Sequence, residues 1–133
     1  MAVLQFARNY QQAAIKTATP GQLVLMLMDG ALRAMATAQA GFQIEAFGPR
    51  IEQINNQLLK AQAILRELNA SLDLRNGGEF AARMRGLYDF MLDRLSAANI
   101  AKEIEPVGVV EKLLREIRDA WATMLEKSVT EAA

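Results

Sequence analysis

The sequence predicts an all-α protein: an antiparallel up-down four-helix bundle with a short N-terminal helical arm. Three observations favour this class. Apolar residues recur every three or four positions in four separate segments, as they do on one face of a helix. No stretch alternates polar and apolar residues for long enough to predict a strand. The joints between the segments are short, and short joints connect antiparallel neighbours in a bundle.

The chain is long enough for one domain, in which we expect residues 1–19 to form the arm and residues 20–127 the bundle. Lys and Arg together number 15, as do Asp and Glu, so the charge balance predicts no nucleic-acid partner. We expect no membrane insertion, because no apolar run approaches the roughly 18–20 residues that span a bilayer. The N-terminus lacks the pattern of a signal peptide, so we expect a cytoplasmic protein.

Catalytic chemistry is largely excluded by composition. The chain has no cysteine and no histidine, which removes thiolate and histidine-based catalysis and the usual zinc and di-iron sites. Asp89 and Asp93 lie four residues apart near arginines, as on a solvated helix face. We therefore predict no catalytic residues, no metal ligands and no cofactor, and a protein that is not an enzyme.

The first bundle helix is expected to begin at Pro20. Thr19 and Gln22 have the spacing of a capping box, and proline is favoured in the first turn of a helix. The helix can continue to about Phe47, where the Gly-Pro pair at 48–49 predicts a stop followed by a restart.

Three further helices follow, at about 49–69, about 79–103 and from Pro106 onward. The inward residues of the second helix are predicted to be Ile51, Ile54, Leu58, Ala61, Leu65 and Leu68. Those of the third are predicted to be Phe80, Met84, Leu87, Met91, Leu95 and Ala98. Those of the fourth are predicted to be Val110, Leu114, Ile117, Trp121 and Met124. Alternating spacings of three and four indicate nearly parallel helix packing.

The run LVLMLM at 23–28 covers every side of a helix for more than one turn, whereas a surface helix has one apolar stripe. On a helical projection, one stripe comprises Leu23, Leu27, Gly30, Ala31 and Ala34. A second stripe, turned away from the first, comprises Leu25, Met28, Leu32 and Met35. Leaving four such side chains in water would forfeit on the order of 10 kcal/mol, which is comparable to the net stability of a domain. We therefore expect the second stripe to be covered.

Two interpretations of the second stripe remain open. In the first, this is a central helix that its neighbours in the bundle bury on two sides. In the second, a groove beside the helix receives another helix, because helix-in-groove recognition uses the same apolar spacing as a core. The covering helix would then be the N-terminal arm, a second copy of the chain or a different protein.

Four stretches together resemble a known family. They are "NYQQAAIKTATPGQLVLMLMDGALRAM", "LNASLDLRNGGEFA", "LYDFMLDRLSAAN" and "LLREIRDAW", and they stand in the same order and at similar separations as in the FliS family of flagellar export chaperones. The resemblance extends from about Gln5 to Trp121.

The resemblance implies a helical-bundle chaperone of the bacterial cytosol. Members of this family bind the C-terminal segment of flagellin, prevent its premature polymerisation and aid its delivery to the flagellar type III export apparatus. It also implies that an N-terminal arm lies over the surface that the client uses. Carried to this chain, the implied partner-binding residues are Tyr10, Gln11 and Ile15 in the arm and Leu25, Met28, Leu32 and Met35 on the first bundle helix.

Other partners are also consistent with the sequence. The surface could serve the export apparatus or a regulatory protein, or it could mediate self-association. The alternative function is therefore a helical-bundle adaptor or oligomerisation module that binds another flagellar or regulatory protein.

Overall fold

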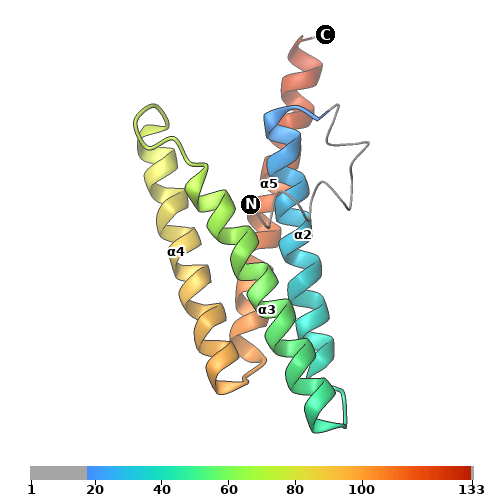
Figure 1. The fold of residues 1–133 in the computed structure, drawn as a ribbon. Coiled ribbons are helices and arrows are strands. Elements are labelled where there is room, and N and C mark those ends of the chain that lie inside the picture. Colours follow the sequence, from blue (N-terminus) through green and yellow to red (C-terminus); the bar gives the residue numbers. More distant parts are fainter. Residues whose placement is uncertain (1–17, 133) are drawn as a thin grey trace.

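The computed structural model describes residues 18–132, and this part of the chain folds into four α-helices without a strand. The helices are α2 (Pro20–Gly41), α3 (Phe47–Ala70), α4 (Gly78–Ala101) and α5 (Glu105–Ala132), as Figure 1 shows. The predicted all-α four-helix class is confirmed. The predicted arm lies almost entirely outside the described residues.

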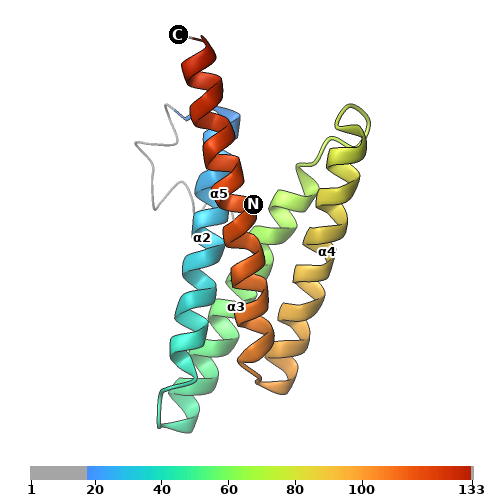
Figure 2. The ribbon, with the colours of Figure 1, turned by 180° about the vertical axis from the view of Figure 1, so that it is seen from behind.

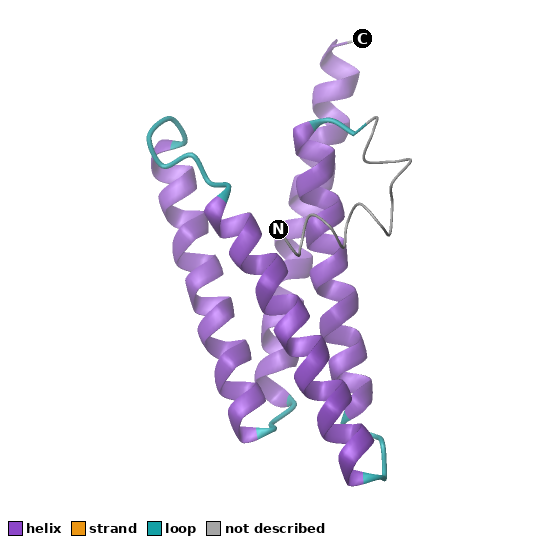
Figure 3. Ribbon diagram, in the orientation of Figure 1, coloured by secondary structure: helices purple, strands orange, loops and turns teal. Residues whose placement is uncertain are grey.

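Successive helices run in opposite directions, and each packs against two others. In Figure 1, α2 and α4 descend while α3 and α5 ascend, and Figure 2 shows the same order from behind. Both α2 and α4 contact α3 on one side and α5 on the other. The loops at 42–46, 71–77 and 102–104 are short, as Figure 3 shows, so the up-down topology follows from the connections.

The start of α2 is fixed by the predicted capping box. The Gln22 backbone N–H donates to Thr19 Oγ1 at 3.2 Å, and the Thr19 backbone N–H donates to Gln22 Oε1 at 2.9 Å. Two donors that the first helical turn cannot satisfy are thereby paired. The predicted capping box at the start of this helix is therefore confirmed.

The predicted end of this helix, at about Phe47, is wrong. The helix ends at Gly41, and the backbone reverses over residues 42–46 through hydrogen bonds that span three residues. A Cβ at position 41 would lie 3.1 Å from Ile54 Cγ1, so glycine lets the end of α2 approach α3 closely. The next helix begins at Phe47, and Pro49 lies inside its first turn.

The core is built from all four helices, and α2 contributes both of its apolar stripes from Leu27 onward. Its buried hydrophobic residues are Leu27, Met28, Ala31, Leu32, Ala34, Met35 and Ala38. Because α3 and α5 flank α2 on two sides, a helix with two apolar stripes is accommodated without an outside partner. Of the two interpretations left open for the second stripe, the central-helix interpretation therefore holds for Met28, Leu32 and Met35.

Two residues that were predicted to point inward are exposed instead. Phe80 near the start of α4 is 57% exposed, and Met124 near the end of α5 is 43% exposed. Figure 1 shows the upper end of α4 diverging from α2 and α5. Periodicity gives the face on which these residues lie, but the neighbouring helices are too far apart at this end to cover them.

Candidate partner-binding pocket

The divergence of the helices leaves a pocket of about 540 Å³ at this end of the bundle. All four helices and the 71–77 loop contribute to its wall. The lining residues are Val24, Met28, Leu68, Ser71, Leu72, Asp73, Gly77, Phe80, Ala81, Met84, Tyr88, Ile117, Ala120, Trp121 and Met124. A largely apolar cavity of this size with a few polar groups is typical of a ligand-binding site.

The direction in which each helix runs shows how far each of its lining residues lies from the open end of the pocket. On α2 and α4, which run away from the open end, the deepest lining residues are Met28 and Tyr88. On α5, which runs toward the open end, Ile117 lies deepest and Met124 lies at the rim. The pocket is therefore deep enough to receive whole side chains of a partner.

One side of the pocket is braced by contacts between α2 and α5. The indole Nε1–H of Trp121 donates to the Gly21 carbonyl oxygen at 2.8 Å. The Arg118 guanidinium donates to the Asp29 carboxylate at 2.7 and 3.5 Å. A Cβ at position 21 would lie 2.6 Å from Leu125 Cδ2, so the two helices meet closely here. These ties hold Trp121 and its neighbours on α5 in place.

The opposite side, between α3 and α4, has polar contacts at its seam. Asn55, Gln62 and Asn69 recur every seven residues along α3. Asn99 Nδ2 donates to Asn55 Oδ1 at 3.0 Å, and Asn69 Nδ2 donates to Asp89 Oδ1 at 2.9 Å. Gln62 is buried, and its Oε1 has no hydrogen-bond partner within residues 18–132. This seam is thus held partly by hydrogen bonds rather than by apolar packing alone.

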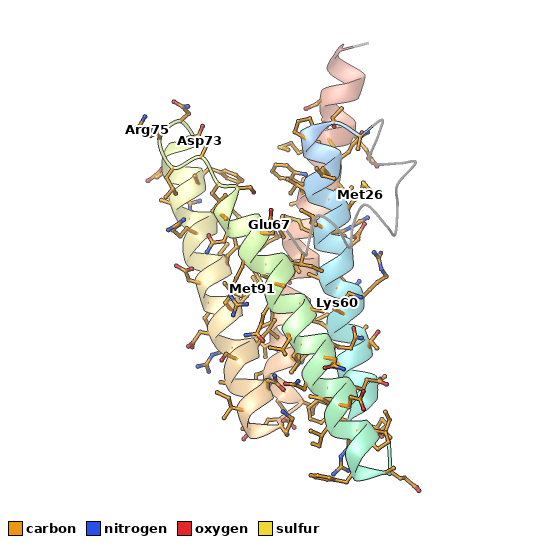
Figure 4. All side chains as sticks on the ribbon, in the orientation of Figure 1. Met26, Lys60, Glu67, Asp73, Arg75 and Met91 are labelled. Carbon is orange, nitrogen blue, oxygen red and sulfur yellow. The ribbon has the colours of Figure 1, made fainter. Side chains whose placement is uncertain are left out.

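The loop above the pocket is ordered by its own hydrogen bonds. The backbone N–H groups of Asn76 and Arg75 donate to Asp73 Oδ1 at 3.0 and 3.2 Å, and Asn76 Nδ2 donates to Oδ2 at 2.9 Å. The backbone hydrogen bond from Asn76, followed by the one from its side chain, holds the pKa of Asp73 below its ordinary value. Figure 4 shows Asp73 and Arg75 at this tip. The rim is therefore shaped before any partner binds.

Tyr88 is the pocket's deepest polar residue. Its side chain is 2% exposed, and burial raises the pKa of Tyr88 to about 12. The phenol is therefore neutral at physiological pH and can both donate and accept a hydrogen bond.

Of the four predicted partner-binding residues that the structure describes, Met28 alone lines the pocket. Leu32 and Met35 lie farther along α2 in the core, and Leu25 is half-buried outside the pocket lining. Tyr10, Gln11 and Ile15 lie outside the described residues. The assignment of these seven residues to partner binding stays a prediction.

Sequence reasoning missed most of the pocket. Phe80, Trp121 and Met124 were all predicted to lie on the inward faces of their helices. The available signal is the size of these three apolar side chains, one of which follows the Gly-Gly pair at 77–78. The sequence does not show that these side chains surround one pocket, because their arrangement depends on how α4 diverges from α2 and α5.

Two further properties of the described residues concern metal binding and membrane insertion. Among the described side chains, those of residues 18–128, no group of three or more acidic, cysteine or histidine residues is placed to hold a metal ion. Within the same range, no helix is long and apolar enough to cross a membrane.

The fold and the pocket together define a class: a four-helix bundle with an apolar, pre-shaped pocket at one end. Comparison with known proteins gives the family of the chain. The family model described as flagellar protein FliS matches residues 3–128, and the chain belongs to the FliS family. The family predicted from the sequence is thus confirmed.

Curated relatives cover nearly the same length. The flagellar secretion chaperone FliS of Bacillus subtilis strain 168 is 37% identical over 126 residues, which is 95% of this chain and 90% of the relative. The FliS of Salmonella typhimurium strain LT2 is 32% identical, over 92% of this chain and 89% of the relative. The flagellar secretion chaperone FliSB of Pseudomonas aeruginosa is 30% identical, over 91% and 96%. These names agree with the export-chaperone role predicted from the sequence.

Proposed function

We propose that this chain is a cytoplasmic export chaperone that binds the C-terminal segment of flagellin, prevents its premature polymerisation and aids its delivery to the flagellar type III export apparatus. The observation that carries the proposal is the apolar pocket, which has two large exposed apolar side chains at its rim, Phe80 and Met124. The names of the relatives as flagellar secretion chaperones support the export role. The proposal includes no catalytic step.

The pocket suits a client that must be held and later released. Each apolar side chain that a partner buries there gains roughly 1.5–3 kcal/mol. A client segment that orders on binding gives back roughly 2–5 kcal/mol or more as conformational entropy. A few anchoring side chains therefore give a moderate affinity, which is compatible with release at the export apparatus.

The proposal retains the N-terminal arm as a cover for the same surface. In the sequence, residues 1–17 are separated by one residue from Thr19, which caps the end of α2 that carries the pocket residue Val24. Tyr10, Gln11 and Ile15 are the proposed arm contacts, and the client would displace them.

The first test is isothermal titration of the full chain with a peptide that covers the C-terminal segment of flagellin from the same genome. We expect a saturable one-to-one isotherm with a negative heat-capacity change, the sign of apolar burial on binding. A flat isotherm with a folded protein would overturn the proposal and favour the adaptor or oligomerisation alternative.

The second test places a charge at the rim, with Phe80→Asp and Met124→Asp as separate variants. Both side chains are exposed, so the bundle should stay folded, while peptide affinity falls at least about tenfold because apolar burial is lost. Ile100→Asp is the matched control, because Ile100 is 84% exposed near the other end of α4. Equal affinities for all three variants and the wild type would exclude the pocket as the client site.

A further inference from the structure

Four side chains with polar groups line the pocket, and the fold itself uses three of them. Ser71 Oγ donates to the Leu68 carbonyl oxygen at 2.8 Å, and the Asp73 carboxylate accepts hydrogen bonds from its own loop. Trp121 Nε1–H donates to the Gly21 carbonyl oxygen. The fourth side chain, Tyr88, is the exception.

Among the described side chains, residues 18–128, no hydrogen bond involves the Tyr88 hydroxyl, although the residue is 2% exposed and lines the pocket. The fully enclosed unpaired side-chain atoms in this range are Gln62 Oε1 and Asn69 Oδ1, so the Tyr88 hydroxyl keeps access to open space. Around it the deep part of the pocket is apolar, with Met28, Met84 and Ile117 among the lining residues. A hydroxyl that is buried among apolar groups is unfavourable unless it is hydrogen-bonded. A ligand that fills the pocket must therefore either pair with this hydroxyl or seal it off unpaired.

We propose that the Tyr88 hydroxyl determines the specificity of the pocket, by pairing with one side-chain hydroxyl or amide of an otherwise apolar helical segment. The inference rests on the proposed function and names the chemistry of the client at its deepest contact. A helical segment uses its own backbone carbonyls internally, so a Ser, Thr, Asn or Gln side chain is the available partner. A client with a wholly apolar residue at this place is disfavoured, because it leaves the phenol buried without a partner.

Tyr88→Phe tests the proposal, because it keeps the ring and removes only the hydroxyl. We expect the free energy of unfolding to be unchanged or raised, and the affinity for the flagellin C-terminal peptide to fall about two- to tenfold, the value of one hydrogen bond. Thr37→Ala is the control: it also removes one hydroxyl, but from an exposed residue of α2 outside the pocket lining, so it should leave the affinity unchanged.

A peptide panel identifies the bonded group. Each Ser, Thr, Asn and Gln of the peptide is replaced in turn by Ala, and every peptide is titrated against the wild type and Tyr88→Phe. We expect one replacement to weaken binding to the wild type and to have no further effect on Tyr88→Phe, which is the signature of direct coupling.

The other outcomes are distinguishable. If Tyr88→Phe binds every peptide as the wild type does while Phe80→Asp binds poorly, the specificity proposal fails and the chaperone proposal stands. A loss of affinity in Tyr88→Phe that couples to no side chain overturns the assignment to a client hydroxyl or amide. A wild type that binds no peptide overturns both proposals.

Discussion

Gly78 opens α4 with a φ of +56°, a left-handed conformation that residues with a side chain adopt only at a cost. We expect Gly78→Ala to lower the free energy of unfolding by about 1–2 kcal/mol, since no neighbour within 4 Å of the added Cβ offers a compensating contact. Urea titration followed by circular dichroism measures the change.

Gly86→Ala is the opposite case within the same helix. Gly86 has an ordinary helical backbone, and nothing lies within 4 Å of an added Cβ. Alanine should therefore raise the free energy of unfolding by about 0.5–1 kcal/mol. If Gly78→Ala and Gly86→Ala changed the free energy of unfolding equally, alanine at position 78 would not be strained by the left-handed backbone.

At the level of single residues, the sequence predicts contacts that are close along the chain. The Thr19–Gln22 capping box is one, because its partners are three residues apart. Pairings between distant residues follow no such rule. Nothing in the sequence indicates that the Trp121 N–H donates to the Gly21 carbonyl oxygen. Nor does anything indicate that the Tyr88 hydroxyl has no hydrogen-bond partner among the described residues.

The α3–α4 seam gives a prediction for a pair of helices. Gln62→Met keeps a similar volume and removes the buried, unpaired Oε1, so it should raise the free energy of unfolding by about 1 kcal/mol. Asn55→Ala in the same heptad position should lower it by about 1 kcal/mol, because it breaks the bond from Asn99. Urea titration checks both, and a destabilising Gln62→Met would mean that a bound water satisfies the amide.

At the scale of whole helices, the apolar periodicity predicts well that a helix exists and which of its faces points inward. It predicts poorly where the helix ends. The helices α3 and α4 begin and end within about two residues of the prediction, whereas α2 ends well before Phe47. The local signal at the end of α2 is the single residue Gly41, which is weaker than the Gly-Pro pair at 48–49, and its close approach to Ile54 of α3 is visible only in the folded chain. The misplaced Phe80 and Met124 have a similar origin, since helix divergence is a property of the assembled bundle.

For the molecule as a whole, we predict that deletion of residues 1–16 leaves a folded bundle. The core formed by residues 27–114 draws on all four described helices, so we expect it to form without the deleted segment. The truncated chain should keep its helical circular dichroism spectrum and unfold in one cooperative thermal transition. Loss of the cooperative transition would show that the segment belongs to the core and is no displaceable cover.

The bundle also accounts for the apolar run at 23–28, for which the sequence leaves two interpretations open. A helix with two apolar stripes requires two neighbours, and α3 and α5 supply both from Leu27 onward. The open apolar surface lies instead around Phe80 and Met124, on two helices whose sequences each show a single ordinary stripe. This surface is open because the helices diverge, and the divergence cannot be predicted from the sequence of any single helix.

Trp121 gives this architecture an optical consequence. It is the chain's only tryptophan, its ring lines the pocket and its N–H is tied to α2. Its indole emission therefore comes from one fixed place on the wall that a ligand would cover, and replacing water there with apolar groups moves the emission to shorter wavelength. The protein carries its own fluorophore at the site of interest, so occupancy of the pocket can be followed without attaching a dye.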